Sequence, residues 1–181
     1  MNKNIILSIT SILVFYIASI SSAFDVTFIN PFPNSSQSQN YNGTNNHPGI
    51  DYSTPTGSGK IYASNYGFIT GIDDTNQDGN RYVESVGENF RCYAYLDDGF
   101  TVDYASGQNW GGYNFVYIRH LIETGDLVYS KYLHLLQNSI VVPNQTFVSK
   151  GQFIALEGRS GCSTSYHLHF EIGKTQPPSN L

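Results

Sequence analysis

The sequence predicts an all-β domain built mainly of antiparallel strands. Short runs rich in aromatic and β-branched residues recur after Asp51, as is typical of strands. Gly, Pro, Asn and Asp separate these runs and supply the turns between them. No segment beyond residue 23 has a helical period of apolar residues. A sheet with a cleft on one face is the expected architecture.

The first element is a signal peptide over residues 1–23. Lys3 precedes an apolar run over residues 5–20, and Ser21, Ser22 and Ala23 form a small-residue cleavage site. We expect cleavage after Ala23 and a secreted protein, extracellular or periplasmic. An uncleaved membrane anchor is the alternative. Because no cysteine stands at the cleavage site, bacterial lipid attachment is disfavoured.

The remaining chain is expected to form one domain behind a short lead-in. Residues 24–40 are rich in Asn, Ser, Gln and Pro and are expected to be irregular, so the domain proper spans residues 41–181. Strands are expected at 60–63, 67–71, 113–119, 127–135, 139–142, 152–156 and 167–172. Residues 72–112 stand apart as an insertion rich in Asp, Gly, Asn and Tyr.

The insertion carries most of the negative charge of the chain. The formal net charge is −5, and residues 73–103 hold eight of the 14 acidic residues but only two of the nine Lys and Arg residues. This balance disfavours nucleic-acid binding. The acidic segment is either a solvated surface hairpin or a selector of cationic substrates.

Part of the insertion resembles the first half of a calcium loop. Asp74, Asn76 and Asp78 would be the Ca²⁺ ligands in a D-x-N-x-D-G pattern. Position 85, where the closing Glu is expected, is Ser85, and Glu84 stands one place early. A tight turn at Gly79 is the alternative.

The two cysteines, Cys92 and Cys162, are expected to form a disulfide in a secreted protein. The bridge would close a loop of roughly 70 residues, worth about 4 kcal/mol in the chain-entropy model. Two free buried thiols are the alternative.

Four of the five histidines fall in three short motifs. His47 and Asp51 are four residues apart, and His134 lies in an apolar, strand-like setting. His167 and His169 form an H-x-H pair, and a strand would place both rings on one face. A catalytic zinc takes three such protein ligands plus a water, so these residues predict a zinc hydrolase.

The three motifs, in order, resemble those of the lysostaphin-like (LytM-type) zinc metallopeptidases of bacterial peptidoglycan. The similar segments are His47 to Gly57 (H-x-G-x-D then P-x-G), Tyr132 to Leu135 (Y-x-H-L), Val148 to Ile154, Gly158 to Thr164 and His167 to Glu171 (H-L-H-F-E). The similarity covers residues 41–175, with the insertion as the main departure. It implies a duplicated-hybrid-motif barrel or sandwich with a metal-binding groove.

The resemblance also implies roles for individual residues. His47, Asp51 and His169 would bind one Zn²⁺ per chain, and His134 and His167 would be the catalytic histidines, with their separate tasks left open. Tyr41 would hydrogen-bond the tetrahedral intermediate. His120 is expected to be a packing residue, and Glu171 either supports a ligand imidazole or faces solvent.

The implied function is that of a secreted zinc metalloendopeptidase acting on the peptides of bacterial peptidoglycan. The protein is expected to be a monomer that binds no nucleic acid and, after signal cleavage, no membrane. Gly-Gly bridges, D-Ala cross-links and stem peptides are all open as the bond that is cut. One alternative is a catalytically silent relative that binds wall peptides or activates another hydrolase. Another is a metal-stabilised adhesion or carbohydrate-binding domain that uses Trp110 and the tyrosines for stacking.

Overall fold

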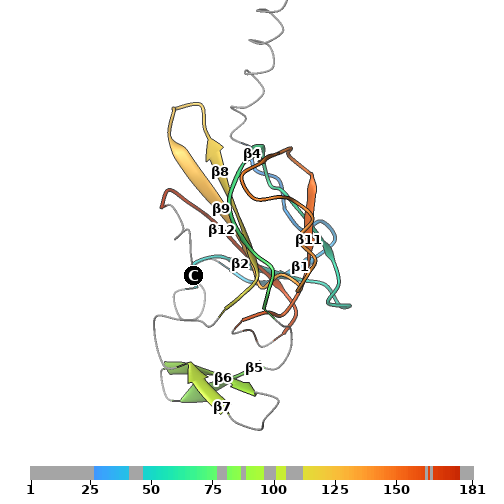
Figure 1. The fold of residues 1–181 in the computed structure, drawn as a ribbon, viewed down its shortest axis with the longest axis vertical. Helices are drawn as coiled ribbons and strands as arrows, with labels where there is room; N and C mark the ends of the chain where they lie inside the picture. The colour runs from blue at the N-terminus through green and yellow to red at the C-terminus, as the bar shows by residue number, and fades with distance from the viewer. Residues whose placement is uncertain are drawn as a thin grey trace, which may run out of the picture.

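The computed structural model describes residues 27–40, 47–76, 81–86, 89–95, 101–104, 112–161, 163 and 165–175. These residues form twelve strands in three antiparallel sheets, and none of them is helical, so the predicted all-β class is confirmed (Figure 1). Within these ranges there is no helix long and apolar enough to cross a membrane.

The largest sheet has seven strands and carries the candidate site. Its strands, in spatial order, are β1 (Ser36–Gln39), β2 (Ile50–Ser53), β12 (Leu168–Gly173), β9 (Leu127–Leu133), β8 (Phe115–Leu121), β4 (Gly67–Asp73) and β10 (Phe147–Val148). Two smaller sheets are formed by β3 (Lys60–Tyr62) with β11 (Phe153–Leu156), and by β5 (Arg81–Val86), β6 (Asn89–Tyr95) and β7 (Thr101–Tyr104). The β5–β7 sheet is drawn at the bottom of Figure 1.

The main core joins one face of the seven-stranded sheet to the β3–β11 pair. Side chains alternate along each strand, so Leu168 and Phe170 of β12 enter this core while His169 and Glu171 take the opposite face. The buried residues of the core are Phe32, Ile61, Ala63, Ile69, Val116, Ile118, Tyr132, Leu135, Val142, Val148, Ile154, Ala155, Leu168 and Phe170. The core therefore fixes which residues of β12 are left for the site.

Residues 139–142 do not form the expected strand. Their sequence is apolar and β-branched, but the backbone N–H groups of Ser139 and Ile140 donate to the carboxylate of Asp74, at 3.3 and 3.1 Å. Because a side chain takes these donors, no ladder forms along the segment.

Six strands of the structure were not among the predicted ones: β1, β2, β5, β6, β7 and β10. Of these, β1 lies in the lead-in that was expected to be irregular.

His120 is a core residue, as predicted. It is buried in β8, where its Nδ1 lies 2.7 Å from the carbonyl oxygen of Tyr66 and its Nε2 lies 2.8 Å from Oγ of Ser130. Ser130 in turn contacts the hydroxyl of the fully buried Tyr132 at 3.3 Å. The imidazole thus completes a polar network inside the core and is separate from the other histidines.

Candidate metal centre

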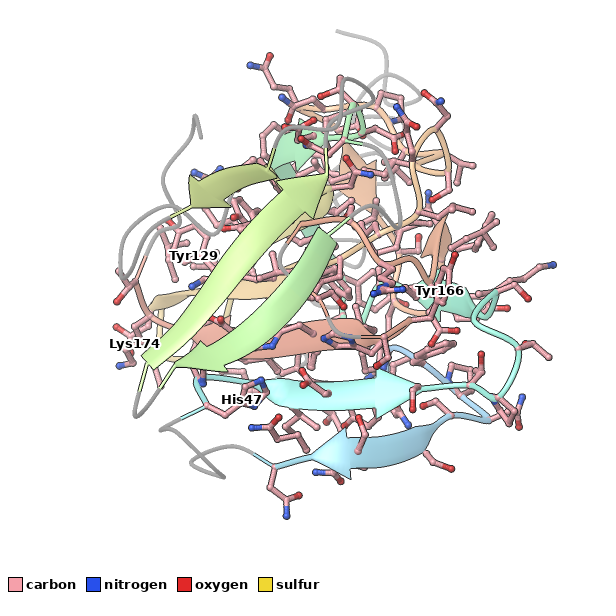
Figure 2. The ribbon with its side chains drawn as sticks, turned by 90° about the horizontal axis from the view of Figure 1, so that it is seen from below. His47, Tyr129, Tyr166 and Lys174 are labelled. Atoms are coloured by element: carbon pink, nitrogen blue, oxygen red, sulfur yellow. The ribbon has the colours of Figure 1, made fainter. Side chains whose placement is uncertain are left out.

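The pairing of β2 with β12 brings Asp51 and His169 together. The two residues are direct cross-strand partners, although 118 positions separate them in the sequence. His47 lies just before β2, and Figure 2 shows it at the start of that strand, with β2 between β1 and β12. Three side chains from two distant segments therefore meet at one end of the β2–β12 pair.

The donor atoms of His47, Asp51 and His169 converge. All lie within 4.8 Å of one another, and Oδ1 of Asp51 is 2.9 Å from Nδ1 of His169 and 3.2 Å from Nε2 of His47. Two ligands of a tetrahedral zinc, each about 2.0–2.1 Å from the ion, are about 3.3 Å apart. The spacing and the His, Asp, His donor set both fit zinc.

Burial adds to the fit of a cation at this place. His169 and Asp51 are both buried, and Nδ1 of His47 is buried with no hydrogen-bond partner. Burial alone would raise the pKa of Asp51, but the hydrogen bond with His169 and the charges of the neighbouring histidines hold it below its ordinary value. The carboxylate is therefore ionised, as a metal ligand must be.

His169 is held between two carboxylates. Its Nδ1 faces Asp51, and its Nε2 lies 3.0 Å from Oε1 of Glu171. Burial lowers the pKa of His169, but the hydrogen bonds with Asp51 and Glu171 outweigh it and raise the pKa to about 9. Glu171 thus supports a candidate ligand imidazole, one of the two roles that the sequence left open.

Gly49 allows the close approach of His169. A Cβ at position 49 would lie 2.6 Å from the carbonyl oxygen of Phe170 and 2.7 Å from Nε2 of His169, well inside normal contact. Only glycine leaves room for the ring against the start of β2. This steric requirement accounts for the glycine between His47 and Asp51.

His134 follows the last residue of β9 in an unusual backbone conformation. Its φ of 63° lies in the left-handed region, which non-glycine residues rarely adopt. Its Nδ1 donates to the carbonyl oxygen of Ser160 at 2.7 Å, so the neutral ring carries its lone pair on Nε2. Burial, together with the charge of His167, lowers the pKa of His134 to about 3.

Asn114 and Ser160 hold the backbone around His134. Asn114 accepts the N–H of Leu135 at 3.2 Å and donates its Nδ2 to the carbonyl oxygen of Leu135 at 3.0 Å. Oγ of Ser160 donates to the same carbonyl at 2.8 Å and accepts the N–H of Asn114 at 2.9 Å. These bonds offset the cost of the left-handed conformation, which is of order 1–3 kcal/mol.

His167 lies beside His134 and faces Asp51. Its Nδ1 lies 2.9 Å from the carbonyl oxygen of Ser165, and its Nε2 lies 3.8 Å from Oδ2 of Asp51. The ring centroids of His134 and His167 are 4.7 Å apart. Burial lowers the pKa of His167 below its ordinary value, against the opposing charge of Asp51.

Several predicted features lie outside the described residues: Tyr41, Asp78, Cys162 and residues 1–23. The calcium loop gains no support, because Asp74 instead binds the backbone of residues 139 and 140.

The sequence did not single out Lys131, which contacts Glu171. It did not single out Asn114 or Ser160 either, which hold the backbone next to His134. Each of these residues is of a common type in a strand or a turn and belongs to no metal-ligand or catalytic motif, so no sequence pattern marked it.

Residues 97–181 match the model of Peptidase family M23. This range includes His134, His167 and His169, whereas His47 and Asp51 precede it. The resemblance to lysostaphin-like metallopeptidases is therefore confirmed over the C-terminal part of the chain. A search of the curated proteins found no match.

Solved structures resemble this chain at the level of the fold. SpoIIQ in complex with SpoIIIAH has a TM-score of 0.53 at 17% identity, over 81% of this chain and 92% of that one. The antimicrobial peptidase lysostaphin from Staphylococcus simulans has a TM-score of 0.50 at 19% identity, over 81% and 45%. A zinc-containing peptidase from Vibrio cholerae has a TM-score of 0.48 at 22% identity, over 83% and 36%. This chain thus spans about a third of the Vibrio protein and less than half of lysostaphin.

Proposed function

We infer that this chain belongs to Peptidase family M23, and we propose that it is a secreted zinc metalloendopeptidase that hydrolyses peptide bonds in bacterial peptidoglycan. One observation carries the proposal: His47 and Asp51, then His134, then His167 and His169, come from three distant segments and meet at one place. A purely structural metal site would need no uncoordinated histidines beside it.

His47, Asp51 and His169 would hold the metal, one ion per chain. A bound zinc ion would supply Lewis acidity, which polarises a carbonyl and brings the pKa of water toward neutrality. The protein contributes a buried carboxylate and two imidazoles on a rigid strand pair, so the ligands need little rearrangement. Gly49 contributes by leaving room for the ring of His169.

His134 and His167 are suited to moving protons. Each donates Nδ1–H to a backbone carbonyl, which leaves Nε2 as the basic nitrogen. Both pKa values are lowered by burial, so both rings are neutral at pH 7 and able to accept a proton. One can take the proton of the attacking water, and the other can return a proton to the leaving amine.

The second candidate is a catalytically silent relative that binds wall peptides or activates another hydrolase. The likeness to SpoIIQ favours it, because that structure is of a complex with SpoIIIAH. All five candidate residues are present in this chain, however, and silence would leave His134 and His167 without a task. We therefore place the enzyme first.

The same proposal covers where the protein acts. Peptidoglycan lies outside the cytoplasm, so the proposed enzyme is extracellular or periplasmic after removal of residues 1–23, and works as a monomer. The acidic excess of the insertion disfavours nucleic acid as a partner.

The test is release of new amino groups from purified peptidoglycans of different cross-link chemistry. We expect release that a chelator abolishes and zinc restores, and that His169→Ala lacks. Lys174→Met, at the exposed end of the same segment, is the control and should behave as wild type. No release from a protein that still binds one zinc per chain would reject the enzyme and favour the silent relative.

A further inference from the structure

A line of polar side chains leads away from His169 across the seven-stranded sheet. Oε1 of Glu171 lies 3.0 Å from Nε2 of His169, and Oε2 of the same carboxylate accepts a bond from Nζ of Lys131 at 2.7 Å. Glu171 and Lys131 are direct cross-strand partners on β12 and β9. The strand register therefore sets the whole line.

This arrangement differs from an ordinary surface ion pair. The side chains of Glu171 and Lys131 are 16% and 25% exposed, whereas those of Lys174 and Asp126, which also pair, are 75% and 52% exposed. Exposed pairs contribute little, because water screens them. Glu171 is shielded, and each of its two oxygens has a partner, so its carboxylate has one preferred orientation.

We propose that Glu171, held in place by Lys131, is the positioning residue that keeps His169 turned with Nδ1 toward Asp51, and thereby sets how tightly the site holds its metal. The inference rests on the proposed function, because it assumes that His169 is a ligand. An imidazole that gives Nδ1 to a metal must carry its proton on Nε2, and Oε1 of Glu171 is placed to accept that proton's hydrogen bond. The bond fixes both the tautomer and the rotation of the ring.

Lys131 has a separate part in the arrangement. A carboxylate with one free oxygen can rotate and exchange the atom that faces the imidazole. The bond to Nζ of Lys131 engages Oε2 and leaves Oε1 for His169. Loss of Lys131 should therefore weaken the hold on His169 less than loss of Glu171 does.

The experiment measures zinc affinity by competition with a chromogenic chelator, for wild type, Glu171→Ala, Glu171→Gln and Lys131→Met. We expect Glu171→Ala to bind zinc about 10–100-fold more weakly. Glu171→Gln keeps an oxygen acceptor and should recover part of that loss, and Lys131→Met should fall between wild type and Glu171→Ala. Asp126→Ala, which removes the carboxylate of the exposed pair, is the matched control and should bind as wild type.

One further measurement separates a loss of structure from a loss of the support given to His169. Thermal unfolding of each metal-free protein shows whether a variant has lost structure rather than a ligand's support, and a weakened affinity counts only where the metal-free Tm is retained. If wild type binds no zinc, the proposed function fails. If wild type binds zinc and Glu171→Ala binds it equally well, only the positioning role is overturned; equal binding by Lys131→Met overturns the part given to Lys131.

Discussion

Gly49→Ala should disturb the metal centre without replacing any ligand. The added Cβ would lie 2.6 Å from the carbonyl oxygen of Phe170 and 2.7 Å from Nε2 of His169. Non-bonded heavy atoms settle at about 3.5 Å or more, so the two sides must separate by roughly 0.8 Å. The carbonyl belongs to the backbone of β12, and the ring is fixed by Asp51 and Glu171, so neither neighbour can swing aside freely.

The expected cost has a structural and a functional part. Overpacking of this kind typically destabilises by about 1–3 kcal/mol, which for a chain of this size lowers Tm by roughly 2–12 °C. The ring of His169 moves relative to Asp51, so zinc affinity should fall. A misplacement near 1 Å can also reduce turnover by about 10²-fold.

The assay compares Gly49→Ala with Gly173→Ala, the latter at the end of β12. At position 173 an added Cβ meets nothing within 4 Å, so that variant controls for the loss of a glycine in itself. Thermal unfolding and zinc competition are measured on both. If Gly49→Ala keeps the Tm and the zinc affinity of wild type, the steric account of the H-x-G-x-D glycine is wrong.

Three further predictions concern other residues. His134→Ala should lower the rate of amino-group release by about 10²–10⁴-fold while one zinc per chain is retained, and zinc loss in this variant would contradict its assignment as a non-ligand. Burial lowers the pKa of His120 in the folded state, so the unfolded chain binds the proton first as pH falls below about 6.5. The contribution of His120 to the free energy of unfolding is therefore complete above that pH. It is lost below that pH, at no more than about 1.4 kcal/mol per pH unit. His120→Gln should therefore flatten the fall in unfolding free energy between pH 7 and 5, and an unchanged slope would refute this. Glu157 is fully buried and accepts the N–H groups of Thr54 and Gly59 at 3.1 and 3.2 Å, so Glu157→Ala should destabilise by about 1–3 kcal/mol or more by calorimetry, whereas the exposed Glu123→Ala should not.

Much of the fold could be predicted because strand composition and alternation are local. The runs that became β3, β4, β8, β9, β11 and β12 are rich in aromatic and β-branched residues and bounded by turn residues. The same reasoning failed at residues 139–142, where a distant carboxylate, that of Asp74, takes the backbone donors. It also missed β1, whose four residues are all polar, and the strands β5, β6 and β7, which lie in an insertion rich in Asp, Gly and Asn.

The sequence by itself determined which residues are available for chemistry: a histidine and an aspartate four apart, a histidine after a strand, and an H-x-H pair on alternating positions. Only the tertiary structure decided that they meet, because the register of β2 against β12 places Asp51 opposite His169, and that register depends on contacts between segments over a hundred residues apart. The same is true of Lys131 beside Glu171 and of Asn114, which bonds to the backbone of Leu135 next to His134. Local patterns record which face a side chain takes, whereas strand pairing across the sheet selects its neighbours, and the chemistry of the site depends on those neighbours.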